Sequence, residues 1–253
     1  MKDESILYDM IPKRKSVRRY HPAPLEPNVL AKIRDSVLNV EPLFGEIGCE
    51  WVILDAAQVK SVLAIRAPHY LCLYSAPEKG YLMNAGYVMQ QADLYLASQG
   101  LGRCFLGMAK PNRDIPRKRG SRHFVMMLAF GLPAEPLHRS QLAEFKRKPL
   151  QEISSVAEGE ELMKIVRLAP SAVNVQPWYF VGDGRRIDAG RLKKGPLLPV
   201  AYDRLRQIDM GIALCYLGLA ARNLGKTVRF AEDQAGGALL PENYMYAMTA
   251  YLN

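Results

Sequence analysis

Two long apolar segments dominate the hydrophobic pattern of this chain, and they resemble each other. The first runs from Gly86 to Phe105 and the second from Gly211 to Phe230. Each begins with residues that are apolar on nearly all sides, which is typical of a helix in the middle of a core. Gly100 and Gly225, 125 positions apart, then suit a helix C-cap, and a short apolar strand follows each.

Other apolar blocks repeat in the same order at a nearly constant spacing. The matching pairs are Trp51–Leu54 with Trp178–Val181, Leu73–Tyr74 with Ala201–Tyr202, and Met127–Phe130 with Met248–Tyr251. A conserved order of blocks indicates two copies of one unit, and the drift in spacing indicates loop insertions in the first copy.

The periodicity predicts helices and strands in both copies. The first copy has a helix at Glu26–Leu38 and strands near Trp51–Leu54, His69–Tyr74, Arg103–Met108 and His123–Phe130. The second has a helix at Glu160–Leu168 and strands near Trp178–Val181, Leu197–Tyr202, Lys226–Ala231 and Asn243–Leu252. Helices and strands without strict βαβ alternation predict an α+β sandwich. We expect halves at residues 1–150, including a Pro-rich and charged connector at 132–150, and 151–253, interlocked as one globular unit.

Composition narrows the class of protein. Of 253 residues 49% are apolar, enough for a substantial core. The longest apolar run, Met210–Ala221, is too short to span a bilayer, and the N-terminus does not look like a signal peptide. Four unpaired cysteines predict free thiols in the cytoplasm, and four scattered histidines give no metal-binding pattern. We therefore expect a cytoplasmic protein with neither a metal site nor a membrane partner.

The net charge of +9 calls for an anionic partner or a solvated surface. Basic residues cluster at Lys13–Arg19, Lys110–Arg122 and Arg139–Lys148. Aromatic residues are not interleaved with these clusters, which argues against a groove for single-stranded nucleic acid. The Lys110–Arg122 cluster contains Pro and Gly and is interpreted as a solvated loop.

Two motifs occur once each, although the rest of the chain looks duplicated. The first, Arg14-Lys-Ser-Val-Arg18, supplies cations and a hydroxyl that suit a phosphate. The second, Ala169-Pro-Ser-Ala-Val-Asn-Val-Gln-Pro-Trp178, supplies small and amide side chains that suit the polar edge of a flat ring. The bland alternatives are surface charge for Arg14 and Arg18, a helix cap for Ser171, and a core position for Trp178, which Trp51 duplicates.

Both motifs resemble those of the nitroreductase family of flavin mononucleotide (FMN) enzymes. Gly100–Gly107 resembles the family's segment after the central helix, and Arg147–Leu150 resembles its basic tail. Family members are commonly homodimers whose two FMN sites each take one motif from either subunit. Here Asn39–Glu50 stands where the first copy would carry the second motif, and no Arg-Ser-Arg motif precedes the second copy. The resemblance implies a nitroreductase-like fold in which tandem copies form an intramolecular pseudo-dimer around long central helices. It also implies one FMN site, so a monomer suffices and further dimerisation stays open.

The resemblance also implies roles for individual residues. Arg14, Lys15 and Ser16 would hold the phosphate, helped by Arg147 or Lys148, and Arg18 would reach the pyrimidine edge of the ring. Pro170, Ser171 and Asn174 would hold the same edge or the ribityl chain, Gln176 would support the loop, and backbone N–H groups at Leu106 and Gly107 would face N5.

The implied activity is reduction of a small-molecule electron acceptor, such as a nitroaromatic or quinone, with NADH or NADPH as transient co-substrate. Flavin N5 would carry the hydride, and no catalytic side chain is assigned. Two alternatives remain: a protein that stores, senses or degrades FMN without turnover, and a basic nucleic-acid-binding protein. If the chain is the FMN-dependent oxidoreductase, we expect no nucleic-acid partner.

Overall fold

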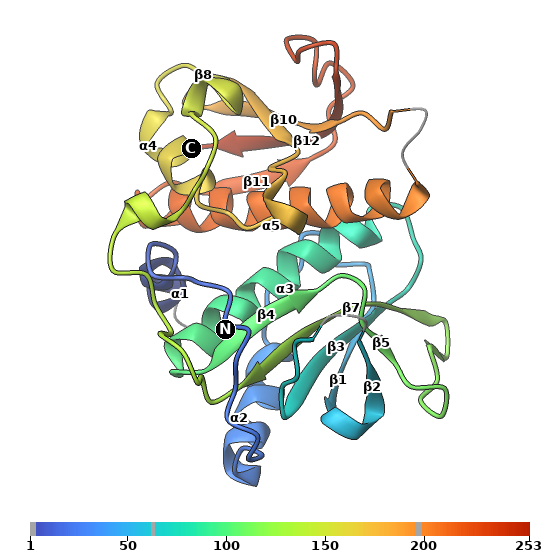
Figure 1. The fold of residues 1–253 in the computed structure, drawn as a ribbon. Helices are drawn as coiled ribbons and strands as arrows, with labels where there is room; N and C mark the ends of the chain where they lie inside the picture. The colour runs from blue at the N-terminus through green and yellow to red at the C-terminus, as the bar shows by residue number, and fades with distance from the viewer. Residues whose placement is uncertain (1–3, 62–63, 196–198) are drawn as a thin grey trace. The chain divides into compact units, whose positions relative to one another are not determined.

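The computed structural model describes residues 4–61, 64–195 and 199–253. The chain divides into two compact units, Met1–Leu142 (unit 1) and Ala143–Asn253 (unit 2). In Figure 1, unit 1 runs from blue to green and unit 2 from yellow-green to red. The division lies inside the predicted connector at residues 132–150.

Unit 1 is a mixed helix and sheet unit built around the long helix α3. Its helices are α1 (Glu4–Met10), α2 (Pro27–Val37), the 3-10 turn η1 (Ala56–Gln58) and α3 (Tyr81–Ser98). Its strands are β1 (Cys49–Asp55), β2 (Val59–Lys60), β3 (His69–Ser75), β4 (Gly102–Leu106), β5 (Lys110–Pro111), β6 (Lys118–Arg119) and β7 (Arg122–Gly131). The main sheet has the antiparallel order β1-β3-β7-β4, with β6 paired to β7, while β2 and β5 form a separate ladder.

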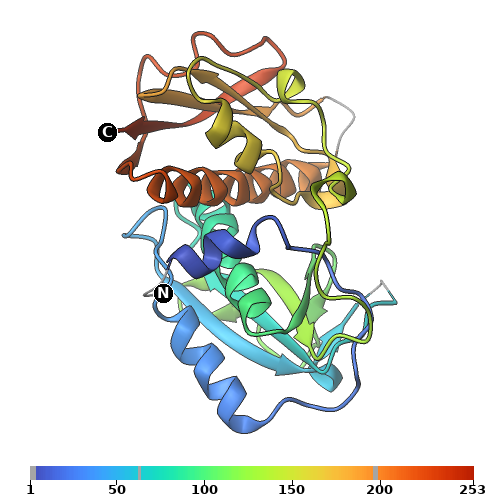
Figure 2. The same cartoon turned by 90° about the vertical axis from the view of Figure 1, so that its left-hand side faces the viewer.

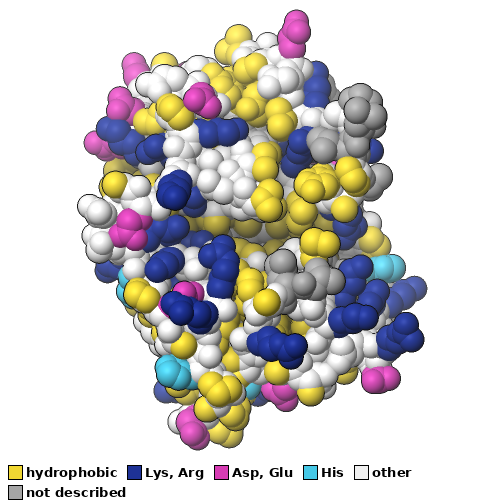
Figure 3. Space-filling model, in the orientation of Figure 1, with side chains coloured by type: hydrophobic (Ala, Val, Ile, Leu, Met, Phe, Trp, Pro, Cys, Tyr) yellow, Lys and Arg dark blue, Asp and Glu magenta, His cyan; other side chains and the backbone are white. Residues whose placement is uncertain are grey.

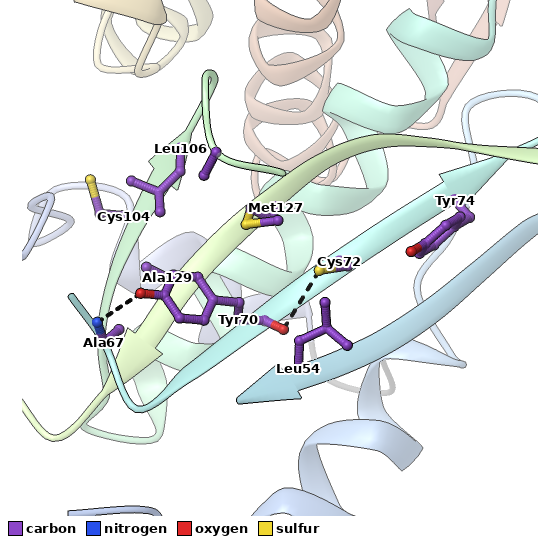
Figure 4. Packing of buried hydrophobic residues seen from close by; sticks show 10 residues of the cluster. Leu54, Ala67, Tyr70, Cys72, Tyr74, Cys104, Leu106, Met127 and Ala129 are labelled. Carbon is purple, nitrogen blue, oxygen red and sulfur yellow. Dashed lines mark hydrogen bonds between the residues drawn. The ribbon is translucent and has the colours of Figure 1, made fainter. Parts of the chain in front are cut away.

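Strand β3 is buried on both faces, and the residues between His69 and Ser75 are apolar without alternation. Tyr70, Cys72 and Tyr74 share one face because side chains alternate along a strand. They pack with residues of β4 and β7, as Figure 4 shows for Cys104 and Met127 among others. Helix α3 contacts β3, β4 and β7. The core of unit 1 therefore reaches both sides of its sheet.

Unit 2 has a second five-stranded sheet with the order β11-β12-β10-β9-β8. Its strands are β8 (Ser154–Val156), β9 (Trp178–Gly182), β10 (Arg186–Leu192), β11 (Val228–Ala231) and β12 (Tyr244–Leu252). Its helices are α4 (Glu160–Val166), α5 (Val200–Asn223) and the 3-10 turns η3 (Leu150–Glu152) and η4 (Ala172–Asn174), while η2 (Leu142–Glu144) lies at the division. Strand β8 is parallel to β9, and the other pairs are antiparallel. Figure 2 shows α5 running along the unit 2 sheet, and α4 packs on α5.

The two sheets repeat one connectivity. Strands β9, β10, β12 and β11 neighbour one another in the same order as β1, β3, β7 and β4, and each long helix falls between its second and third strands along the chain. Gly100 and Gly225 end these helices with the same φ of +73°. A positive φ is easy only for glycine, so both C-caps need this residue. The repeated apolar pattern therefore corresponds to a repeated topology.

One predicted strand is wrong. Ala201 and Tyr202 lie in α5, and Leu197 and Leu198 fall outside the described residues. The strand that follows β9 is β10, which the sequence pattern concealed because Asp188 and three arginines or glycines interrupt its apolar residues. Asp188 is tolerated there because its carboxylate accepts hydrogen bonds from Thr249 Oγ1 and Gly237 N.

Two expectations about the core, a buried Trp178 and free cysteines, are confirmed. Trp178 is fully buried, and the four cysteines are free, with Cys49 half-buried and the other three buried.

Among the helices of the described ranges, none combines the length and the apolar character that a bilayer span requires. Within those same ranges, no cluster of three His, Cys, Asp or Glu side chains could hold a metal ion.

Candidate functional site

The loop at residues 169–177, which joins α4 to β9, holds three of the four non-glycine residues with positive φ in the described part of the chain. Val173, Asn174 and Gln176 have φ angles of 45°, 60° and 51°. Glu158 is the one other non-glycine residue with positive φ among those described. This conformation is unfavourable for β-branched valine above all, and strain of this kind persists only where the surroundings impose it. Strained backbone concentrates at functional sites, which supports the prediction that this loop carries function.

Internal hydrogen bonds hold the strained loop in place. The Ser171 hydroxyl accepts from the Gln176 backbone N–H at 2.8 Å, so Ser171 does not cap η4 with its side chain. Gln176 is 2% exposed; its Nε2 donates to the Asn174 carbonyl at 3.1 Å, and its Oε1 accepts from the Lys148 backbone at 2.9 Å. Pro170, just before, is buried. Gln176 therefore acts as an internal brace between the loop and the basic tail.

Two segments that the sequence singled out meet within unit 2. Arg147 Nη1 donates to Asn174 Oδ1 at 2.7 Å, and Arg147 Nη2 donates to the Leu168 carbonyl at 3.1 Å. Lys148 Nζ lies 3.4 Å from the Gln176 carbonyl, and Asn174 Nδ2 donates to the Lys146 carbonyl at 2.8 Å. The cations of the basic tail thus lie beside the amide and hydroxyl side chains of the loop.

Two further residues support this arrangement and were not predicted. Arg167 donates to the backbone carbonyls of Lys148 and Arg147, at 2.5 and 3.2 Å. Asp209 on α5 is 4% exposed, and its Oδ1 accepts from the Ala172 N–H at 2.9 Å. Burial raises the pKa of the Asp209 carboxyl to about 7. Asp209 directly precedes the apolar run Met210–Ala221, and nothing in that sequence pattern marks its carboxylate as the partner of the loop.

In unit 1, Arg14 lies in a buried ionic cluster. Its Nε and Nη2 contact the Asp93 carboxylate at 2.9 and 3.3 Å, and Arg103 Nε lies 3.7 Å from the same carboxylate. Arg14 is 2% exposed, while Asp93 and Arg103 are fully buried. Arg14 Nη1 also donates to the Ser16 hydroxyl at 3.1 Å. The surface-charge interpretation of Arg14 is therefore wrong, because Asp93 on α3 takes up this guanidinium.

The rest of the first motif lies closer to solvent. Val17 is fully buried, and its N–H donates to the Arg103 carbonyl at 3.0 Å. A Cβ at Gly102 would lie 2.8 Å from Val17 Cγ1, so the close approach of the arm to β4 requires glycine there. Arg18 is exposed and Lys15 half-buried, and neither side chain makes a hydrogen bond or ion pair with any described residue. Their contact with a ligand stays a prediction.

The remaining predicted contacts lie at the end of β4. Leu106 is the last residue of the strand and is 1% exposed, whereas Gly107 directly after it is exposed. The structure places these two residues in unit 1, together with the arm. Their contact with a flavin stays a prediction.

The basic cluster Lys110–Arg122 forms an exposed surface of unit 1. Figure 3 shows Lys and Arg side chains gathered where Figure 1 draws β5 and the segment after it. Arg119 Nε and Arg122 Nη1 lie 2.5 and 4.0 Å from the Glu50 carboxylate. Most of this segment is exposed, in agreement with a solvated, partly ion-paired surface.

Comparison with known proteins identifies the same family that the two sequence motifs resemble. The family described as "Putative TM nitroreductase" matches residues 6–221. A solved structure from Thermotoga maritima msb8, described as a "putative nitroreductase", is 20% identical with a TM-score of 0.62, over 97% of this chain and 92% of that one. No curated protein matches this chain.

Shorter solved structures resemble part of the chain. A nitroreductase family protein from Clostridium novyi NT is 17% identical, with a TM-score of 0.42, over 51% of this chain and 86% of that one. A nitroreductase with bound FMN from Desulfitobacterium hafniense DCB-2 is 12% identical, with a TM-score of 0.42, over 59% of this chain and 100% of that one. Since the family match spans most of the sequence, this chain belongs to the nitroreductase family.

Proposed function

We propose that this chain is an FMN-dependent oxidoreductase that uses NADH or NADPH to reduce a nitroaromatic, quinone or similar small acceptor. Membership of the nitroreductase family supports an oxidoreductase. The observation that carries the flavin proposal is the strained loop at residues 169–177, which is bonded to Arg147 and Lys148.

The residues present fit the chemistry of FMN. A flavin carries an anionic phosphate and a ring whose pyrimidine edge exchanges hydrogen bonds with amides and hydroxyls. Arg147 and Lys148 supply positive charge beside Ser171 and Asn174 in unit 2. When bound, FMN supplies the hydride chemistry, while the protein positions it and tunes its charge.

The cations of the first motif differ in exposure: Arg14 is buried, Lys15 is half-buried and Arg18 is exposed. Arg14 is paired with Asp93 and orients Ser16, so of the three cations in the motif, Lys15 and Arg18 are the two that reach solvent. In our proposal Ser16 and Lys15 meet the phosphate, together with Arg14 where its remaining donor capacity allows. Arg18 faces the pyrimidine edge, where a cation favours the reduced, anionic ring.

We further propose that each chain holds one FMN, completed by the arm of unit 1 and the loop of unit 2 in a pseudo-dimer. The support is that each motif occurs once while the topology occurs twice. The loop at residues 39–48 of unit 1 has no non-glycine residue with positive φ, so only one copy carries the strained form.

The test is the absorption spectrum and flavin content of the purified protein, followed by NADH and NADPH oxidation with nitroaromatic and quinone acceptors. We expect one flavin per chain and acceptor-dependent turnover. If the protein binds flavin but turns over with no acceptor, the result would favour a flavin-storing or flavin-sensing protein over an enzyme. A protein that takes up no FMN would end the proposal.

A further inference from the structure

The long helices carry equivalent positions that reach the loop before β1 in unit 1 and the loop before β9 in unit 2. Asn84 on α3 and Asp209 on α5 are 125 positions apart, like the cap glycines. Asn84 is fully buried, and its Oδ1 accepts from the backbone N–H groups of Leu43 and Phe44, at 2.9 and 3.1 Å. Asp209 accepts from the N–H of Ala172. The same task is therefore done by a neutral amide in unit 1 and by a titratable acid in unit 2.

The bond from Asp209 replaces a missing cap. The first N–H groups of a helical turn lack partners within the turn. Ser171 stands at the N-cap of η4, but its hydroxyl accepts from Gln176 instead. Asp209 satisfies Ala172 from outside the loop, directly before the strained residues Val173 and Asn174.

We propose that Asp209 is a positioning residue that holds the strained loop at residues 169–177 through Ala172, and that loss of its proton loosens the loop. An ionised carboxylate this deeply buried is unfavourable, and the cost falls when the loop opens and water reaches the carboxylate. The neutral acid keeps an oxygen that can accept the Ala172 N–H without this cost. Asn84 shows that a neutral group suffices for the same bond.

The direction in which the stability of the closed loop changes with pH follows from the shift in the Asp209 pKa. The pKa of Asp209 is raised to about 7 in the closed loop, above its value in water. Stabilisation of the closed loop is therefore complete below the pKa of the water-exposed acid, about 4, and is lost as the pH rises from there through about 7. Arg206 lowers this pKa without cancelling the effect of burial.

Charged groups on the elements packed against α5 have other partners. They are Lys164 with Glu160, Arg191 with Asp203, Arg186 with Asp188 and Asp233, Arg167 with two backbone carbonyls, and Arg229 over the Tyr251 ring. Glu161 on α4 is exposed. Arg206 itself donates to the Lys193 carbonyl at 2.6 Å.

The experiment is amide hydrogen exchange at Ala172–Val175 in the full chain, at about pH 5.5 and about pH 8.5, corrected for the intrinsic exchange rate. The variants are Asp209→Asn, which keeps the acceptor but cannot ionise, Asp209→Ala, which removes it, and Asn84→Ala as the matched control in unit 1. In the wild type we expect protection to fall about tenfold toward the higher pH. Asp209→Asn should keep high protection at both values, Asp209→Ala should lose it at both, and Asn84→Ala should follow the wild type. Equal pH dependence in the wild type and Asp209→Asn, or full protection in Asp209→Ala, would overturn the proposal.

A second readout rests on the function proposed above. FMN affinity, measured by titration at the same two pH values, should fall with pH in the wild type relative to Asp209→Asn. The comparison between variants cancels ionisation of the flavin phosphate itself. A wild type that binds no FMN would refute the proposed function, while the exchange data would still decide the role of Asp209.

Discussion

The loop at residues 39–48 of unit 1 and the loop at residues 169–177 of unit 2 occupy the same place in the same topology, yet their backbones differ. The first has no non-glycine residue with positive φ, and the second has three. Both are anchored by a polar side chain of the long helix that follows in the chain. An anchor of this kind is therefore part of the fold, whereas the strain is particular to the loop with the family motif.

The two long helices also differ in where each carries its buried acid. Helix α3 buries Asp93, which gathers Arg14 and Arg103, whereas the position 125 residues later on α5 is Gly218. Helix α5 buries Asp209, where α3 has Asn84. Each helix thus carries one buried acid, and that acid anchors the segment of its own unit that is predicted to bind flavin.

The largest effect is expected from Asp93→Leu, which leaves the guanidinium groups of Arg14 and Arg103 buried without their carboxylate. Breaking such a cluster costs about 3–5 kcal/mol of unfolding free energy. Urea denaturation measures it, with Asp35→Asn on the exposed side of α2 as the control. A loss below about 1 kcal/mol would mean that Asp93 does not anchor the arm.

A smaller effect, of opposite sign, is expected at Asp209. Because its folded-state pKa is raised, its stabilising contribution is present below the unfolded pKa and lost as the pH rises through about 7. Asp209→Asn should therefore raise the unfolding free energy by about 2–4 kcal/mol above pH 8, with little change near pH 4. Denaturation curves across this range check it; a constant difference between the two proteins would contradict the assignment.

Release of the loop strain should be smaller still. Val173 is 86% exposed with a φ of 45°, so Val173→Gly relieves the backbone and removes few contacts. We expect a gain of about 1 kcal/mol. Leu38 is the matched control, because it is 73% exposed with a φ of −70°, and Leu38→Gly should destabilise slightly. Equal losses in both variants would show that Val173 is not strained.

The smallest change in stability is expected for Arg18→Glu, within about 0.5 kcal/mol, because this side chain is exposed. The same variant should weaken FMN binding about tenfold or more by reversing a charge beside the ligand. A titration with FMN measures it, and Lys13→Glu, exposed at the start of the same arm, is the control. If both variants weaken FMN binding equally, Arg18 contributes only to the overall positive charge of the arm and makes no specific contact.

Much of the fold could be predicted, because both long helices have continuous apolar patterns closed by glycine and several strands contain short apolar runs. Strand β10 could not, since the partners that make Asp188 tolerable, Thr249 and Gly237, lie far away in sequence. The candidate loop and the basic tail were recognisable as motifs. Asp93 and Asp209 were not, because a single buried acid becomes informative only once its partner is known. The burial of Arg14 was hidden for the same reason.

We propose that one loop, one arm and one flavin belong to each chain. Calorimetric titration of the flavin-free protein with FMN tests it most directly, with Arg18→Glu and Asn174→Leu alongside. We predict a single site per chain that both variants weaken, although one change lies in unit 1 and the other in unit 2. Two sites per chain, or full affinity in either variant, would contradict the account.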